Sequence, residues 1–164
     1  MTSADLLALY QPLLNGTLGY FRKVSDDTPH LDDALWSGTF DTPDGPKEET
    51  AQSLRQVMAH CVIGTYEVPR AMVDGTFERV PAAAAALAGL APSDLTAKLE
   101  AATAEVLALI GGLDEAALAE SRTTPLGTTS VGVALCLAAT HLAHHKGQMT
   151  VLLRRAGLRP GRMF

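Results

Sequence analysis

The C-terminal quarter of the chain carries its strongest helical pattern. From Val131 to Arg155, apolar residues recur three and four positions apart, the spacing of one face of an α-helix. His141 and His145 lie on that apolar face, within about 40° of each other when successive residues are placed 100° apart. The polar side of the same helix is marked by Thr140, Lys146, Thr150 and Arg154. The pattern therefore predicts a helix whose two imidazoles point into the core.

A first helix is predicted from Ser3, a favourable N-cap residue, to about Val24. Pro12 lacks a backbone donor, so it should kink this helix or shift its start. The following segment, Ser25–Lys47, is rich in Asp, Gly and Pro and has no sustained period, which predicts a long loop. Its large apolar residues, Trp36 and Phe40, are expected to anchor the loop on the helices or, alternatively, to line a site.

A second helix is predicted from about Lys47 to Asp74, with Glu48 and Glu49 in its first turn and a bend at Pro69. His60 lies three residues after an apolar position and four before another, so this histidine should also face inward.

A third helix should begin at an N-cap, Ser93, and end at Gly111 and Gly112. The alanine-rich stretch before it, residues 75–92, reads as a linker with one short helix. A second short helix over 114–120 and a turn near Pro125 lead to the last helix.

Together these patterns predict an all-α protein. We expect a single domain, residues 1–164, folded as a four-helix bundle with a long loop between helices 1 and 2 and a short helical linker between helices 2 and 3. Apolar residues make up 47% of the chain and aromatic residues only 5%, so the core should consist mainly of Leu, Ala and Val. The long loop permits a topology other than simple up-down-up-down.

The composition and net charge limit the kinds of partner that this chain is expected to bind. A net charge of −5 disfavours a nucleic-acid partner, and the basic residues near the C-terminus are explained by the dipole of the last helix. The chain shows neither a signal peptide nor a membrane-spanning apolar run, and its two cysteines, Cys61 and Cys136, are expected to be buried free thiols. These features favour a cytoplasmic protein without a membrane partner.

The inward histidines are the main candidate chemistry. His141 and His145 stand at positions i and i+4 of one helix, where two imidazoles can bind the same metal ion. His60 supplies a third imidazole from another helix. The alternative is a set of hydrogen-bonded core histidines. Small residues at Gly64, Ala134 and Ala138 would leave room for a ligand, and Gln148 is a candidate hydrogen-bond donor behind the site.

Several segments resemble the DinB/YfiT family. The run HLAHHKGQM at 141–149 closely resembles the last helix of that family, and TPLG at 124–127 and SLR at 53–55 are also similar to it. The resemblance implies a four-helix bundle that binds a divalent cation, commonly zinc or nickel, through His60, His141 and His145. Two positions depart from the usual pattern: Lys146 stands where arginine is common, and Leu126 where an aromatic residue often follows the proline.

The resemblance specifies the metal-binding residues more closely than the chemical reaction. Some members are S-transferases or isomerases that use a low-molecular-weight thiol such as bacillithiol or mycothiol, so the leading hypothesis is a thiol-dependent S-transferase acting on an electrophilic substrate. The alternatives are a metal-dependent hydrolase and a non-catalytic, stress-related metal-binding protein; a homodimer is also expected.

Sequence features separate these functions in part. The absence of an H-E-x-x-H motif removes the usual general base of a zinc hydrolase. A structural site would need a fourth protein ligand, for which the candidates are His144, Cys61 and Cys136. The helical phase of these three residues does not favour that role.

Overall fold

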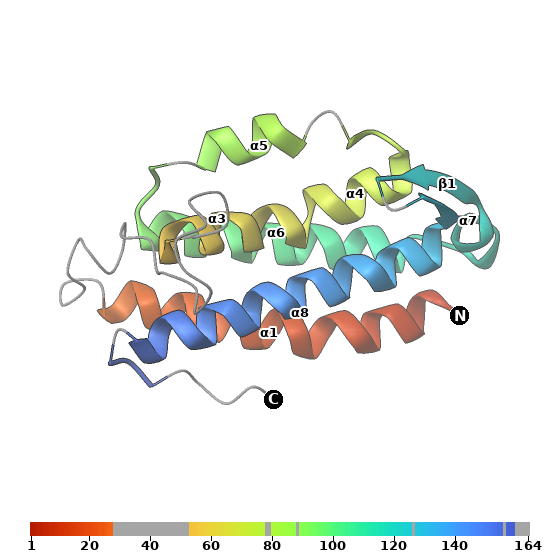
Figure 1. Ribbon diagram of the computed structural model, residues 1–164. Helices are drawn as coiled ribbons and strands as arrows, with labels where there is room; N and C mark the ends of the chain where they lie inside the picture. The colour runs from red at the N-terminus through yellow and green to blue at the C-terminus, as the bar shows by residue number, and fades with distance from the viewer. Residues whose placement is uncertain (28–52, 78–79, 88, 126, 156, 160–164) are drawn as a thin grey trace, which may run out of the picture.

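The computed structural model describes residues 1–27, 53–77, 80–87, 89–125, 127–155 and 157–159. Its long helices lie side by side, and the chain is predominantly helical, which confirms the predicted all-α class (Figure 1). The long loop expected after the first helix, with Trp36 and Phe40, lies outside the described residues, as do Glu48 and Glu49. The elements are α1 (Ser3–Asp27), α3 (Leu54–Thr65), α4 (Glu67–Asp74), α5 (Val80–Leu87), α6 (Pro92–Gly111), α7 (Glu115–Ala119), β1 (Ser121–Thr124), β2 (Gly127–Ser130) and α8 (Val131–Arg155).

The helices do not simply alternate in direction. Helix α5 runs back over α3 and α4, so α6 starts near the beginning of α3 and runs the same way as the α3–α4 pair (Figure 1). Helix α1 packs against α6 and α8, and α3 packs against the same two helices from the other side. The short helix predicted in the linker is therefore the crossover that makes this topology possible.

Helix α1 begins close to the predicted position but with a different cap. Thr2, not Ser3, closes its first turn: the Thr2 Oγ1 accepts a hydrogen bond from the Asp5 amide at 3.2 Å, and the Thr2 amide donates to Asp5 Oδ2 at 2.8 Å. The helix runs continuously to Asp27 with Pro12 inside it, so the proline does not move its start.

The predicted second helix is divided in two. Ser53 is the N-cap of α3 and forms a capping box with Gln56, so this helix starts at Leu54 rather than near Lys47. Tyr66 separates α3 from α4. Proline cannot donate to the carbonyl four residues earlier and its ring clashes with that carbonyl, which explains an interruption one turn before Pro69.

Helix α6 and the segment after it also refine the predictions. Ala91 is the N-cap of α6, with Pro92 in the first turn, so Ser93 lies inside the helix; the end at Gly111 and Gly112 is confirmed. The turn expected near Pro125 is a two-stranded antiparallel hairpin, β1–β2. Its strands are mostly polar, SRTT and GTTS, and lack the alternating apolar pattern that identifies a strand from sequence.

The core lies between α1, α3, α6 and α8. Its largest fully buried side chains include Tyr10, Tyr20 and Phe21 of α1, and the Tyr10 hydroxyl donates a 2.8 Å hydrogen bond to the Leu135 carbonyl of α8. This bond satisfies a buried polar group and fixes α1 against α8. Across the described parts of the chain, the structure contains no helix with the length and apolarity needed to span a membrane.

The polar side of α8 is partly covered by α1. Lys146 and Thr150 are only 5% and 9% exposed. The Lys146 ammonium lies 5.6 Å from the centre of the Tyr20 ring, and Thr150 Oγ1 lies 3.0 Å from the Lys146 carbonyl oxygen. A long aliphatic stem and an aromatic neighbour make this burial possible.

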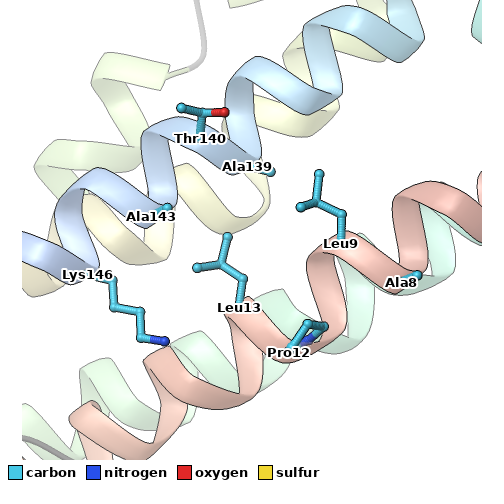
Figure 2. Close-up of a pocket in the computed structure, with 8 residues that line it drawn as sticks. All are labelled: Ala8, Leu9, Pro12, Leu13, Ala139, Thr140, Ala143 and Lys146. Atoms are coloured by element: carbon cyan, nitrogen blue, oxygen red, sulfur yellow. The ribbon is translucent and has the colours of Figure 1, made fainter. Parts of the chain in front are cut away.

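Lys146 extends toward α1 beside a shallow space between the two helices, here named the lysine groove (Figure 2). The groove has a volume of about 340 Å³. It is lined by Ala8, Leu9, Pro12, Leu13, Ala139, Thr140, Ala143 and Lys146.

Candidate metal centre

Three histidines from two helices come together where α3 packs against α8. His60 of α3 approaches His141 and His145 of α8, with ring centroids 5.2 and 4.3 Å away; the two α8 rings are 4.4 Å apart. One nitrogen from each ring can be chosen so that all three atoms lie within 4.8 Å of one another. The three residues selected from helical phase are thus brought together, and no other set of three or more His, Cys, Asp or Glu residues in the described ranges has this arrangement.

The environment keeps these imidazoles neutral. His145 is buried, with 6% of its surface exposed, whereas His60 and His141 retain contact with solvent. Burial lowers the pKa of all three rings, and charge on neighbouring histidines lowers it further. The pKa of His145 falls to about 4, even though its hydrogen bond to Gln148 acts in the opposite direction. Neutral rings at pH 7 offer a lone pair, which a metal ligand requires.

Gln148 sets the orientation of His145. Nδ1 of His145 lies 2.7 Å from Gln148 Oε1, which can only accept, so this nitrogen carries the proton. Nε2 of His145 then presents its lone pair toward His141, whose Nε2 lies 2.9 Å away. Gln148 was expected to be a donor behind the site; its carbonyl oxygen is instead the acceptor that selects the tautomer.

The cluster fits a divalent cation. Two nitrogens bound at 2.0–2.1 Å in tetrahedral geometry are roughly 3.3 Å apart, and the nitrogens here lie between 2.9 and 4.8 Å from one another. Three neutral imidazoles form a donor set suited to zinc, nickel or copper, whereas calcium and magnesium prefer oxygen. The arrangement is therefore compatible with a divalent transition metal.

A pocket of about 420 Å³, here named the histidine pocket, adjoins the cluster and has His60 and His141 in its wall. The remaining wall comes from α3, α4, the connection between α4 and α5, α5, the hairpin turn and α8, and consists of Ile63, Val68, Met72, Phe77, Val80, Pro125, Leu137 and Ala138. Of the small residues expected to leave room, Ala138 lines it. A methyl group at Gly64 would lie 3.9 Å from His141 Nδ1.

Several wall residues were not identified from the sequence. Met72 comes from α4, Phe77 and Val80 come from the predicted linker, and Pro125 comes from the hairpin turn. Apolar side chains carry no chemical signature, and their convergence depends on the path of the α5 crossover. The only available signal was the spacing of Val68 and Met72, which places both on one face of a helix.

The proposed fourth ligands do not join the cluster. His144 is exposed, and its ring lies 5.1 Å from that of His145. Cys61 is fully buried against Met149, with 3.8 Å between the sulfurs, and burial raises the pKa of its thiol to about 12. The Cys136 sulfur lies 3.5 Å from the Met1 sulfur. None of these three residues belongs to the three-histidine group, so the site has no fourth protein ligand among the described residues.

Comparison with known proteins identifies the family of this chain. The sequence model of the DinB superfamily matches residues 20–149, most of the chain. The chain belongs to the DinB superfamily. This match includes all three clustered histidines. No curated protein sequence matches this DinB-superfamily chain significantly.

Solved structures share its fold at low sequence identity. A DinB-like protein, YjoA, from Bacillus subtilis superposes with a TM-score of 0.64 and 18% identity, covering 93% of this chain and 92% of its own. The mycothiol-dependent maleylpyruvate isomerase and a mutant of it each superpose with a TM-score of 0.53 and 16% identity, covering 95% of this chain and 70% of theirs. These likenesses establish a common fold for the DinB-superfamily protein.

Proposed function

We propose that this protein is a metal-dependent S-transferase that uses a low-molecular-weight thiol, with His60, His141 and His145 as ligands of a divalent cation, zinc or nickel. The observation that carries the proposal is the convergence of three neutral imidazoles beside an open pocket. The isomerase that shares the fold is mycothiol-dependent, which supports a thiol as the cofactor. We expect the active species to be a homodimer, as predicted from the sequence.

The protein residues would act mainly by positioning. The histidines come from two helices that the core holds in contact, so the donor geometry is preorganised. Gln148 holds the His145 ring in the tautomer whose Nε2 is free to coordinate. A cation bound to three neutral ligands keeps its full charge and an open position, where it lowers the pKa of a bound thiol. The apolar wall of the histidine pocket would exclude water from the second substrate.

The two alternatives are less well supported. A hydrolase commonly uses a carboxylate as general base, and the described lining of the histidine pocket includes no Asp or Glu. A purely structural site is normally closed by a fourth protein ligand. The candidates for that ligand, His144 and the two cysteines, lie outside the cluster.

A cobalt-substituted protein tests the proposal directly. We expect a thiolate-to-metal charge-transfer band when cysteine or mycothiol is added, because an open coordination position accepts the sulfur. His60→Ala should remove the band and the bound cobalt. A spectrum that is unchanged by millimolar thiol would contradict S-transfer. Failure of untagged protein to take up zinc, nickel or cobalt would contradict the ligand assignment itself.

A further inference from the structure

The wall of the histidine pocket is almost entirely apolar. Apart from its two imidazoles, every described residue in its wall is apolar, and these residues come from six separate segments of the chain. Met72 is buried, and Phe77 is half-buried, so these side chains face the pocket rather than bulk water. A ligand in this space meets hydrocarbon and aromatic surface except where it reaches the histidines.

Charge is poorly accommodated in such a pocket. The described wall supplies neither a lysine nor an arginine. A carboxylate on the apolar part of the wall, against Met72, would therefore lose its hydration without gaining a partner charge from the described side chains. An uncharged aromatic or branched aliphatic group would instead gain from leaving water.

Leu137 supports the same conclusion at the pocket entrance. Its side chain is 40% exposed, although it lies one turn before His141 on the same helix and is part of the pocket wall. An exposed leucine at the edge of an apolar pocket extends the apolar contact surface toward an entering ligand. Val133, one turn earlier, is 46% exposed but is not part of that wall.

We propose that the second substrate is an uncharged electrophile with an apolar body, which binds against Met72, Phe77 and Leu137 and presents its reactive carbon to the histidine cluster. This inference rests on the proposed function, because it names the substrate class of the same site. For an alkyl chloride, the thiolate sulfur attacks the carbon, the S–C bond forms and the C–Cl bond breaks. Chloride leaves with the electron pair, and the thiol proton passes to solvent.

Binding of unreactive probes tests the inference without relying on metal or thiol. Benzyl alcohol and para-(hydroxymethyl)benzoate differ only by a carboxylate, and NMR titration of the purified protein measures both. We expect benzyl alcohol to bind at least about tenfold more tightly, with shifts at the Leu137 and Met72 methyl groups. Equal affinity for the two probes, tighter binding of the carboxylate or binding of neither would overturn the proposal.

A matched pair of variants locates the selectivity. Leu137→Lys places a cation at the pocket edge, and we expect it to reverse the preference toward para-(hydroxymethyl)benzoate. Val133→Lys adds the same charge at a comparably exposed position of α8, so it should leave both affinities within about twofold of the wild type. If Val133→Lys changes the preference as strongly as Leu137→Lys, general surface charge is responsible and the assigned pocket is wrong.

A turnover experiment separates this inference from the proposed function. Zinc-loaded protein is supplied with mycothiol and either benzyl chloride or para-(chloromethyl)benzoate, and thioether formation is measured above the spontaneous rate. Faster catalysis with benzyl chloride supports both proposals. Selective probe binding without catalysis of either chloride counts against S-transfer alone and leaves the apolar ligand class supported.

Discussion

Helix α8 has a hollow on each of two opposite sides, and the two hollows differ in what their side chains do. The histidine pocket lies toward α3 and the lysine groove toward α1 (Figure 2), with volumes of about 420 and 340 Å³. Both are largely apolar. In the histidine pocket, however, imidazoles from α3 and α8 converge on one point, whereas the lysine groove has a single basic group whose ammonium lies beside the Tyr20 ring.

This difference shows that converging ligand groups, rather than the volume of a hollow, distinguish the candidate metal site. Neutral imidazoles whose nitrogens lie within 4.8 Å of one another form a donor set that a cation can complete. A buried ammonium against an aromatic face already has a favourable electrostatic environment, and its long stem fills space between helices. The histidine pocket is therefore the better candidate for a ligand site, and Lys146 is accounted for by packing between α1 and α8.

The largest expected effect concerns the proposed metal ligands. His145→Ala and His141→Ala should each weaken zinc binding by more than about 100-fold, beyond the loss typical of residues behind a metal site. Lys146→Met, on the other side of the same helix, should leave zinc affinity within about threefold of the wild type. Competition against a chromophoric chelator measures all three variants. Comparable loss in Lys146→Met would show that helix packing, not ligation, controls the affinity.

The second prediction concerns the stability of the metal-free protein. The pKa of His145 is about 4 in the folded state, against 6.5 for an unperturbed histidine. Below pH 6.5 the unfolded chain takes up the proton first, so stability present above that pH is lost as the pH falls toward 4. One such group contributes a slope of at most about 1.4 kcal/mol per pH unit.

Chemical denaturation between pH 7 and pH 4 measures this slope in chelator-treated protein. His145→Gln keeps a polar side chain but cannot titrate, so the free energy of unfolding should depend less steeply on pH than in the wild type. The difference between the two proteins removes the common contribution of the carboxylates. Parallel pH curves would show that burial of His145 does not oppose its protonation.

The comparison also shows how far the sequence alone could lead. Helical phase placed His141 and His145 together because both lie on one helix, where the spacing fixes the geometry. His60 was found because its neighbours in α3 follow the same apolar pattern. These are local rules, so they worked before any contact between helices was known.

Some of the missed features depend on contacts between distant segments, and others depend on competing local signals. Lys146 lies on the polar side of α8 by its pattern, yet α1 covers it, and no local rule shows that Tyr20 will stand opposite its ammonium. The sequence predicted a bend at Pro69, whereas the second helix is divided one turn earlier, at Tyr66. The sequence offers two signals for the start of this helix. The acidic pair Glu48 and Glu49 suggested a start near Lys47, whereas the capping box at Ser53 marks the start that is observed.

The smallest expected effect belongs to His144, and it tests the phase argument most sharply. This histidine is adjacent in sequence to His145 and its ring lies 5.1 Å away, yet it is exposed and outside the three-histidine cluster. His144→Ala should therefore change zinc affinity by less than about threefold, because only the inward nitrogens can share one cation. The same chelator competition measures it beside His141→Ala. Equal loss of zinc affinity in both variants would contradict the assignment. His144 would then be a ligand in solution, or His141 and His145 would be the wrong pair, and helical phase would not identify the ligands.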